Sequence, residues 1–331
     1  MNLLITGANG FVGTSLVQHL LAGGHGITAQ VRSLQRLAWS SELPSKKEPS
    51  TQHLQALEAD FTDISGFQQT LRGCEALVHC AARVHQVQDN ASDPLAAYRR
   101  DNRDATLALA RLAAQDGVQR FVLLSSVKVN GEFTQHGQPF RAQDATPQDP
   151  YAISKWEAEQ GLLEIAAKTG MEVVIIRPPL VYGPGVKANF LTMMQWLHRG
   201  IPLPFGAINN RRSLVALPNL VDFITLCLTH PKAANRTFLI SDQQDLSTTQ
   251  LLRGLGDALH RPARLLPVPQ HVLELGLKAV GKGDVAQRLC GSLTVDSSPA
   301  TELLGWKPPL TVQQGLQLTA DHFLKQQASK P

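Results

Sequence analysis

The segment Gly7–Gly13 (GANGFVG) constrains the fold of this chain more than any other feature of the sequence. It follows a short apolar run, Asn2–Thr6, and precedes Phe11–Ala22, whose apolar periodicity predicts a helix. Between a strand and a helix, two glycines let the backbone turn tightly and approach a pyrophosphate, and a third lets the helix pack closely on the sheet. The helix N-terminus adds free N–H groups. We therefore expect dinucleotide binding through Gly7, Asn9, Gly10, Phe11, Val12 and Gly13.

Strand-like and helix-like segments alternate through the first half of the chain. Such alternation predicts an α/β fold, a doubly wound parallel sheet of the Rossmann type, over residues 1–177. After Arg177 prolines become frequent, which indicates a smaller C-terminal substrate lobe over 178–331 with segments near 213–242 returning to the first domain. Strands are expected at Asn2–Thr6, Gly26–Val31, His53–Leu57, Ala76–Cys80, Arg120–Ser125, Glu172–Ile176 and Thr237–Ile240, and helices at Phe11–Ala22, Ile64–Leu71, Pro94–Gln115, Pro150–Lys168 and Thr311–Leu324.

Composition excludes several classes of protein. The excess of 31 basic over 27 acidic residues is small, and only 5% of residues are aromatic, so a nucleic-acid partner is not expected. The 4 cysteines and 11 histidines lack the spacing of a disulfide framework or a metal site, so no metal is expected. No apolar run reaches the ~18 residues of a membrane span, and no leader precedes Asn2, so we expect a cytoplasmic protein.

The end of the second expected strand bears on the choice of cofactor. An acidic residue there would bind the adenosine ribose hydroxyls, but the chain has Val31 followed by Arg32. An uncharged position beside a guanidinium suits a 2′-phosphate, which favours NADP(H) and leaves NAD(H) as the alternative. Asp60, followed by Phe61 at the end of the third strand, is expected to contact the adenine, although it could equally cap a helix.

A tyrosine and a lysine share one face of a predicted helix. Asp149 and Pro150 are typical of a helix start, and Tyr151 and Lys155 lie four residues apart within that helix. A nearby ammonium is expected to lower the pKa of the tyrosine and make it a usable general acid or base. Ser126, at the end of a strand in the same domain, could orient a substrate carbonyl or hydroxyl toward Tyr151.

Together these motifs resemble the extended short-chain dehydrogenase/reductase family. The resemblance covers nearly the whole chain, and within the family it is strongest for nucleotide-sugar 4-epimerases and 4-ketoreductases of surface-polysaccharide pathways. The run Ser125–Glu132 (SSVKVNGE) is similar to that of the reductases that form UDP-N-acetylquinovosamine for O-antigen. The matching segments are residues 6–13 (TGANGFVG), 79–82 (HCAA), 125–126 (SS), 151–155 (YAISK), 177–184 (RPPLVYGP) and 303–308 (LLGWKP).

The resemblance implies roles for individual residues. Ser126, Tyr151 and Lys155 would form the catalytic set, with Tyr151 and Lys155 also contacting the cofactor. It implies further a homodimer formed by the helices 94–115 and 150–168. The remaining expected cofactor contacts are Cys80, Ala81, Ala82, Asn102, Pro178 and Val181, and the expected substrate contacts are Ser126, Asn189, Phe190 and Arg212, with Arg212 on the diphosphate.

Departures from the family pattern help to distinguish dehydration, epimerisation and ketone reduction as possible activities. Sugar 4,6-dehydratases carry an Asp-Glu pair where this chain has Val127-Lys128, which disfavours dehydration. Val31 counts against an epimerase that retains NAD. The favoured hypothesis is NADPH-dependent reduction of a 4-keto nucleotide sugar of the UDP-4-keto-6-deoxy-HexNAc type. A UDP-hexose or UDP-HexNAc 4-epimerase with tightly held NAD is the alternative. A non-sugar ketone reductase and a non-catalytic dinucleotide-binding protein rank lower, the latter because the chain keeps both Tyr151 and Lys155.

Overall fold

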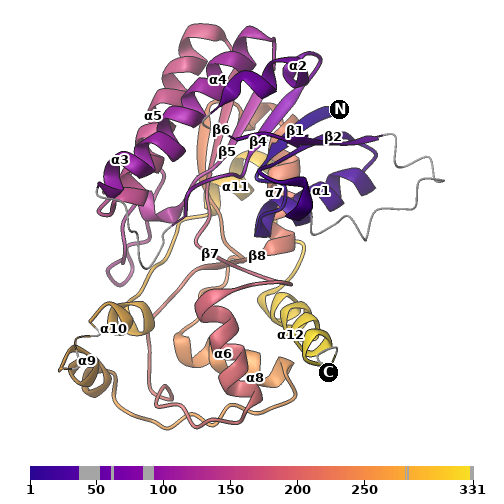
Figure 1. Ribbon diagram of the computed structural model, residues 1–331. Coiled ribbons are helices and arrows are strands. Elements are labelled where there is room, and N and C mark those ends of the chain that lie inside the picture. The colour runs from indigo at the N-terminus through magenta and orange to yellow at the C-terminus, as the bar shows by residue number, and fades with distance from the viewer. Residues whose placement is uncertain (37–52, 61–62, 85–92, 280, 282, 329–331) are drawn as a thin grey trace.

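Seven parallel strands form the central sheet, in the order β3-β2-β1-β4-β5-β6-β9 (Figure 1). The computed structural model describes residues 1–331 apart from 37–52, 61–62, 85–92, 280, 282 and 329–331. The strand order reverses between β1 and β4, the position at which sheets of this kind bind their ligands. The doubly wound α/β class predicted from the sequence is confirmed. The strands are β1 (Asn2–Thr6), β2 (Gly26–Val31), β3 (Leu54–Glu58), β4 (Ala76–His79), β5 (Arg120–Leu124), β6 (Glu172–Arg177) and β9 (Arg236–Leu239).

Different helices cover the two faces of the sheet because alternate residues of each strand point to opposite sides. Leu3 and Ile5 of β1 pack in a core with α1 and α7, whereas Leu4 packs in a separate core with α2, α4 and α5. Burial on both faces explains why these strands are almost continuously apolar in sequence. The helices are α1 (Phe11–Ala22), α2 (Gln68–Leu71), α4 (Ala105–Gln115), α5 (Pro150–Thr169) and α7 (Leu217–Thr229).

The helix predicted over Pro94–Gln115 is interrupted. It begins as α3 (Pro94–Tyr98), passes through a π-helical turn at Arg99–Asp104, and continues as α4. A π turn inserts an extra residue into the helix and is frequent at functional sites. Here it carries Asn102, which is 1% exposed, toward the loop after β4. The predicted bounds of the helical segment are confirmed, but apolar periodicity carries no signal for a π turn within it.

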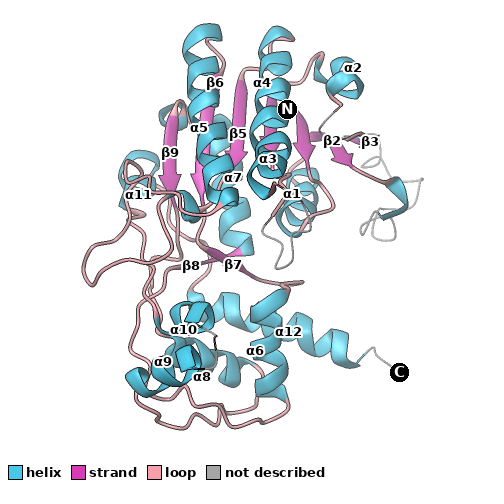
Figure 2. Ribbon diagram, turned by 60° about the vertical axis from the view of Figure 1, so that its left-hand side comes forward, coloured by secondary structure: helices cyan, strands magenta, loops and turns pink. Residues whose placement is uncertain are grey.

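A second lobe lies below the sheet (Figure 2). Its core includes Tyr182 and Phe190, whose rings stack with centroids 5.6 Å apart. The predicted terminal helix starts at Val312 and extends to Ala328, and the short parallel strands β7 and β8 were not predicted. The elements of this lobe are β7 (Leu180–Tyr182), α6 (Ala188–His198), β8 (Leu214–Ala216), α8 (Thr248–Ala258), α9 (Gln270–Ala279), α10 (Gly283–Cys290) and α12 (Val312–Ala328).

Several later segments pack against the central sheet. The strand expected at Thr237–Ile240 forms one residue earlier as β9 and pairs with β6. The helix α11 (Ser298–Leu304) and the following Trp306 join the same core as α1 and α7, and the Trp306 indole donates to Asp222 at 2.8 Å. Residues after 178 therefore contribute to both parts of the molecule. Among the described residues, no helix has the length and apolar character needed to cross a bilayer.

Candidate active site

The glycines at the loop between β1 and α1 occupy positions where a Cβ would not fit. Gly7 has φ of +64°, and a Cβ at this position would lie 2.8 Å from the Cα of Ala81 in the loop after β4. A Cβ on Gly13 would lie 2.2 Å from the carbonyl oxygen of Gly7. The helix α1 begins after Gly10 with no side chain bonded to its first N–H groups, which leaves these donors for an anion. The residues present therefore fit the diphosphate of a dinucleotide.

A buried glutamine on β2 fixes this loop, and sequence reasoning missed it. The Gln30 side chain accepts a hydrogen bond from the N–H of Gly7 at 3.0 Å and donates one to the carbonyl oxygen of Ala59 at 2.6 Å. It thereby connects the glycine loop to the end of β3. The available signal was a glutamine, with a long polar side chain, within the strand-like run Gly26–Val31.

The ends of β2 and β3 lie side by side. The N–H of Ala59 donates to the carbonyl oxygen of Val31 at 3.1 Å, so the exposed side chains of Arg32 and Asp60 belong to the same edge of the sheet. This edge can receive the adenosine end of a dinucleotide, because it lies beside the glycine loop. Phe61, expected as a cofactor contact, is outside the described residues.

The loop after β4 is held by Asn102. Its side-chain oxygen accepts from the N–H of Arg83 at 2.7 Å, and its amide nitrogen donates to the carbonyl oxygen of Arg83 at 3.1 Å and to the Ser154 hydroxyl at 3.0 Å. Asn102 thus connects α5 to the segment that contains Ala81 and Ala82. Burial raises the pKa of the Cys80 thiol to about 12, so this side chain is neutral and unreactive.

The residue before this loop, His79, was not assigned a role from the sequence. Its Nδ1 hydrogen-bonds the Thr6 hydroxyl at 2.8 Å, and its Nε2 hydrogen-bonds the Thr106 hydroxyl at 2.9 Å. Burial lowers the pKa of His79 to about 3. The imidazole is therefore neutral at physiological pH and connects β1, β4 and α4 as a structural residue.

Tyr151 lies on the first turn of α5, beside Ser126. The carboxylate of Asp149 accepts from the N–H of Ala152 at 2.7 Å, which caps the helix at the residue expected from the sequence. Ser126 follows β5, and its hydroxyl hydrogen-bonds the phenol of Tyr151. Burial raises the pKa of Tyr151 to about 12, although the bond with Ser126 opposes this rise. In the chain alone Tyr151 is therefore a protonated phenol.

Lys155 is 1% exposed, one turn further along α5. Its ammonium donates to the carbonyl oxygen of Leu124 at 2.8 Å, and burial lowers the pKa of Lys155 to about 8. The expectation that this ammonium brings the pKa of Tyr151 below its ordinary value is wrong for the chain alone, because the effect of burial on the phenol dominates. The structure nevertheless brings Ser126 and Tyr151 into hydrogen-bond contact and buries Lys155 one turn further along α5.

Arg212 lies in the second lobe at the edge of β8. Its guanidinium donates to the carbonyl oxygen of Gly291 at 3.0 Å, and burial lowers its pKa. Within the described parts of the chain it makes no ion pair with a carboxylate. The charge of Glu132 opposes this fall in the Arg212 pKa, but no described carboxylate lies within ion-pair distance of the guanidinium, which is therefore suited to bind a phosphate group.

The two expected substrate contacts on α6 differ from each other. Asn189 is exposed on the first turn of the helix. Phe190 is 2% exposed and stacks on Tyr182, so its side chain belongs to the core of the second lobe. An apolar residue at the start of an amphipathic helix faces the core, so a substrate contact at Phe190, which stays a prediction, would be made by its backbone.

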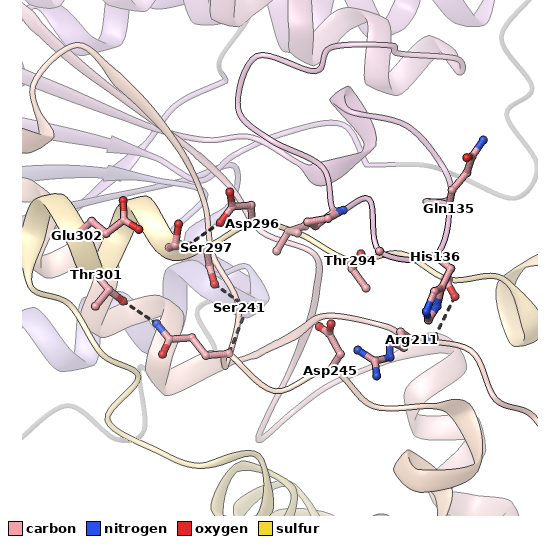
Figure 3. A pocket seen from close by; sticks show the side chains of 16 residues that line it. Gln135, His136, Arg211, Ser241, Asp245, Thr294, Asp296, Ser297, Thr301 and Glu302 are labelled. Carbon is pink, nitrogen blue, oxygen red and sulfur yellow. Dashed lines mark hydrogen bonds between the residues drawn. The ribbon is translucent and has the colours of Figure 1, made fainter.

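A cavity of about 560 Å³ lies elsewhere, between the segments 135–139, 241–245 and 292–302 (Figure 3). Its lining contains Arg211 but none of Ser126, Tyr151, Lys155 and Arg212. Neighbouring residues of an extended segment point to opposite sides, so Arg211 and Arg212 face different parts of the molecule. No group of three or more His, Cys, Asp or Glu within the described ranges is arranged to hold a metal ion.

Comparison with known proteins identifies the family. Residues 3–241 match the model of the NAD dependent epimerase/dehydratase family. The chain is 46% identical over 326 residues to a UDP-glucose 4-epimerase of Vibrio cholerae, covering 98% of this chain and 96% of the relative. It is 26% identical over 335 residues to the N-acetyl-alpha-D-glucosaminyl-diphospho-ditrans,octacis-undecaprenol 4-epimerase of Escherichia coli O157:H7, covering 97% of this chain and 95% of that protein.

The fold is also similar to that of solved structures. The UDP-glucose 4-epimerase of Thermotoga maritima, solved with UDP-glucose, superposes with a TM-score of 0.77 at 22% identity and covers 99% of this chain and 100% of the other. The family model covers most of the central sheet, the glycine loop and the Ser126, Tyr151 and Lys155 positions. The chain is therefore an enzyme of the extended short-chain dehydrogenase/reductase type and belongs to the NAD dependent epimerase/dehydratase family.

Proposed function

We propose that this enzyme is an NAD-dependent 4-epimerase of a UDP-hexose or UDP-N-acetylhexosamine. The observation that carries the proposal is the 46% identity, over nearly the full length of both chains, to the Vibrio cholerae protein described as a UDP-glucose 4-epimerase. The joint presence of Ser126, Tyr151 and Lys155 supports it, because all three groups serve proton transfer at a sugar hydroxyl. The similarity to this relative favours the 4-epimerase, which was the alternative hypothesis from the sequence, over the 4-keto reductase.

The catalytic roles follow from the geometry of the three side chains. The chemistry that NAD supplies when bound is reversible hydride transfer at C4 of the sugar. Tyr151 takes the C4 hydroxyl proton as that carbon is oxidised to a ketone, and returns it to the alkoxide when the ketone is reduced on its opposite face. Ser126, hydrogen-bonded to Tyr151, orients the C4 oxygen. Arg212 holds the diphosphate while the 4-keto sugar rotates to present its opposite face.

Proton acceptance requires the phenolate form of Tyr151. Its pKa of about 12 in the chain alone must therefore fall when the enzyme is loaded. Positive charge close to a phenol stabilises the phenolate. The ammonium of Lys155 supplies one such charge, and NAD⁺ would supply another when bound. Lys155 is held one turn from Tyr151 by its bond to the carbonyl oxygen of Leu124 at 2.8 Å.

A second candidate function is NADPH-dependent reduction of a 4-keto nucleotide sugar. It is favoured by Val31 and Arg32, because the end of β2 has no acidic side chain for the ribose hydroxyls and has an exposed guanidinium for a 2′-phosphate. The reductase would use the same Tyr151 proton in one direction only. It would also exchange its cofactor at every turnover.

The test uses purified enzyme with three substrates. UDP-glucose, UDP-N-acetylglucosamine and undecaprenyl-diphosphate-linked N-acetylglucosamine are each incubated without added cofactor, and the C4 configuration is read by proton NMR. In parallel, NADPH or NADH is supplied with UDP-4-keto-6-deoxy-N-acetylglucosamine, and absorbance at 340 nm is followed. Conversion to the C4 epimer without net change at 340 nm supports the epimerase. NADPH consumption that Tyr151→Phe abolishes, with no epimer formed, replaces it by the reductase.

The assembly of the enzyme is part of the same proposal. We expect a homodimer in which the helical segment of residues 94–115, which ends in α4, and the helix α5 of each protomer form the interface, as the family resemblance implies. Light scattering of the purified enzyme measures its mass directly against the 36.0 kDa of one chain.

A further inference from the structure

A buried ion pair lies directly behind the catalytic residues. Glu159 on α5 and Arg177 at the end of β6 are 0% and 3% exposed. The Arg177 Nε donates to Glu159 Oε1 at 3.0 Å and Nη2 donates to Oε2 at 2.5 Å, which is a two-pronged contact. Such pairs are costly to desolvate and contribute little net stability. Neither residue has a role in the catalytic cycle described above.

The pair joins every element that carries a catalytic residue. The Ser125 hydroxyl donates to Glu159 Oε1, and Ser125 immediately precedes Ser126. The N–H of Ser125 donates to the carbonyl oxygen of Ile176 at 2.7 Å, next to Arg177. Arg177 Nη1 donates to the Asn130 side chain at 3.1 Å and to the carbonyl oxygen of Ala142 at 2.9 Å. The Glu159–Arg177 pair thus holds together the ends of β5 and β6, the loop after Ser126 and the helix that carries Tyr151 and Lys155.

Glu159 also lies one helical turn after Lys155, so the two side chains share a face of α5. Besides Glu159, the Lys155 ammonium interacts with the carbonyl oxygen of Leu124 and with His79 and Cys80 at the end of β4, and Tyr151 lies one turn before it on the same helix. At neutral pH the phenol, imidazole and thiol are uncharged. Glu159 is therefore the one carboxylate, within the described residues, whose charge favours the ammonium form of Lys155.

We propose that Glu159 is a positioning residue, which acts through Lys155 by keeping its buried side chain charged and through Ser125 by holding Ser126 against Tyr151. Arg177 fixes the carboxylate in place through its two-pronged contact, which compensates part of the cost of burying the two charges. Glu159 touches neither substrate nor cofactor. The catalytic consequence rests on the proposed role of Lys155 in epimerisation, but the charge effect is measurable in the chain alone.

The test measures the ionisation of Lys155 directly. Enzyme labelled with ¹³C at the lysine ε-carbon is titrated by NMR without cofactor, and the Lys155 signal is assigned from its loss in Lys155→Met. The wild-type signal is expected to titrate near pH 8. In Glu159→Gln the midpoint is expected to fall by at least one pH unit, because the negative charge is lost and the positive charge of Arg177 is left behind. An unchanged midpoint in folded Glu159→Gln overturns the proposal.

Two further variants keep the result interpretable. Glu157→Gln removes a carboxylate from the same helix that pairs instead with Arg99 and Arg103, and it is expected to leave the midpoint unchanged. If Glu159→Gln does not fold, Glu159→Gln/Arg177→Met removes both charges, an exchange that proteins often tolerate. Its midpoint is expected below the wild-type value by less than one unit. A midpoint equal to wild type in this double variant contradicts the proposal.

A kinetic measurement separates positioning from mere stability. The alkaline limb of the kcat profile is expected to move to lower pH in Glu159→Gln, in step with the Lys155 titration. A purely structural role would lower kcat equally at all pH values. Absence of any turnover by the wild-type enzyme would count against the proposed function, whereas the NMR titration would still decide the effect of Glu159 on Lys155.

Discussion

Replacing Gly13 by alanine tests whether the first loop binds the cofactor through its backbone. The added Cβ would lie 2.2 Å from the carbonyl oxygen of Gly7 and 2.9 Å from the Cα of Ala8. Both neighbours are backbone atoms, so no change of rotamer relieves the contact. To bring the Cβ out to 3.0 Å, the N-terminus of α1 must move away from the loop by about 0.8 Å or more.

The magnitude of the effect follows from this shift. Overpacking of this kind destabilises a protein by about 1–3 kcal/mol. A displaced helix N-terminus also loses hydrogen bonds to the diphosphate, each worth about 1.5–3 kcal/mol when the acceptor is charged. Loss of one such bond corresponds to about 10- to 140-fold weaker binding of the dinucleotide at 1.4 kcal/mol per factor of ten.

Isothermal titration calorimetry with NAD⁺ and NADP⁺ measures this affinity, and thermal unfolding measures stability. Gly276→Ala on α9 is the matched control, because a Cβ there meets nothing within 4 Å. That variant is expected to bind as wild type and to be slightly more stable, since alanine is a better helix former than glycine. Wild-type affinity in Gly13→Ala would refute the assignment of this loop to the cofactor.

Three further predictions concern charge. Because Lys155 must be an ammonium and its pKa is about 8, kcat is expected to fall as pH rises through this value, which a profile from pH 6 to 10 measures. Arg212→Ala is expected to raise the KM for the nucleotide sugar by about 10- to 140-fold, through loss of a charged hydrogen bond to the diphosphate. The control variant, Arg211→Ala, is expected to leave the KM unchanged. Equal effects of the two substitutions on the KM would show that Arg212 does not bind the diphosphate. His79 is neutral in the folded chain, with a pKa of about 3, whereas in the unfolded chain it binds a proton below about pH 6.5. The free energy of unfolding, measured by urea titration, is therefore expected to decrease as the pH is lowered from 7 to 5. The decrease in the free energy of unfolding should be smaller in His79→Asn.

The parts of the structure that were predicted from the sequence depend on local pattern. The runs Asn2–Thr6 and Gly26–Val31 are mostly apolar because both faces of the sheet are covered, and such runs are visible without knowledge of the fold. The loop at Gly7 needs a positive φ and a close approach to Ala81, and glycine is the residue that permits both. Tyr151 and Lys155 are recognisable because one helix fixes their spacing.

The parts that were missed depend on contacts between distant segments. Glu159 meets Ser125 across 34 residues and Arg177 across 18, and no periodicity connects them. The helix α11 packs in the core beside α1 and α7, and the sequence of α11 does not indicate which element its apolar residues contact. The pKa of Tyr151 is not lowered as expected, because the sequence shows the nearby lysine but does not show that the phenol is buried.

The most direct test of the proposed function follows the hydrogen at C4. UDP-galactose carrying deuterium at C4 is incubated with the enzyme and an excess of unlabelled NADH. An epimerase that retains its cofactor returns the same hydride, so the UDP-glucose product is expected to keep the deuterium at C4, with no net change at 340 nm. Deuterium appearing in the NADH pool, or no conversion while a 4-keto sugar consumes NADPH, would contradict the account.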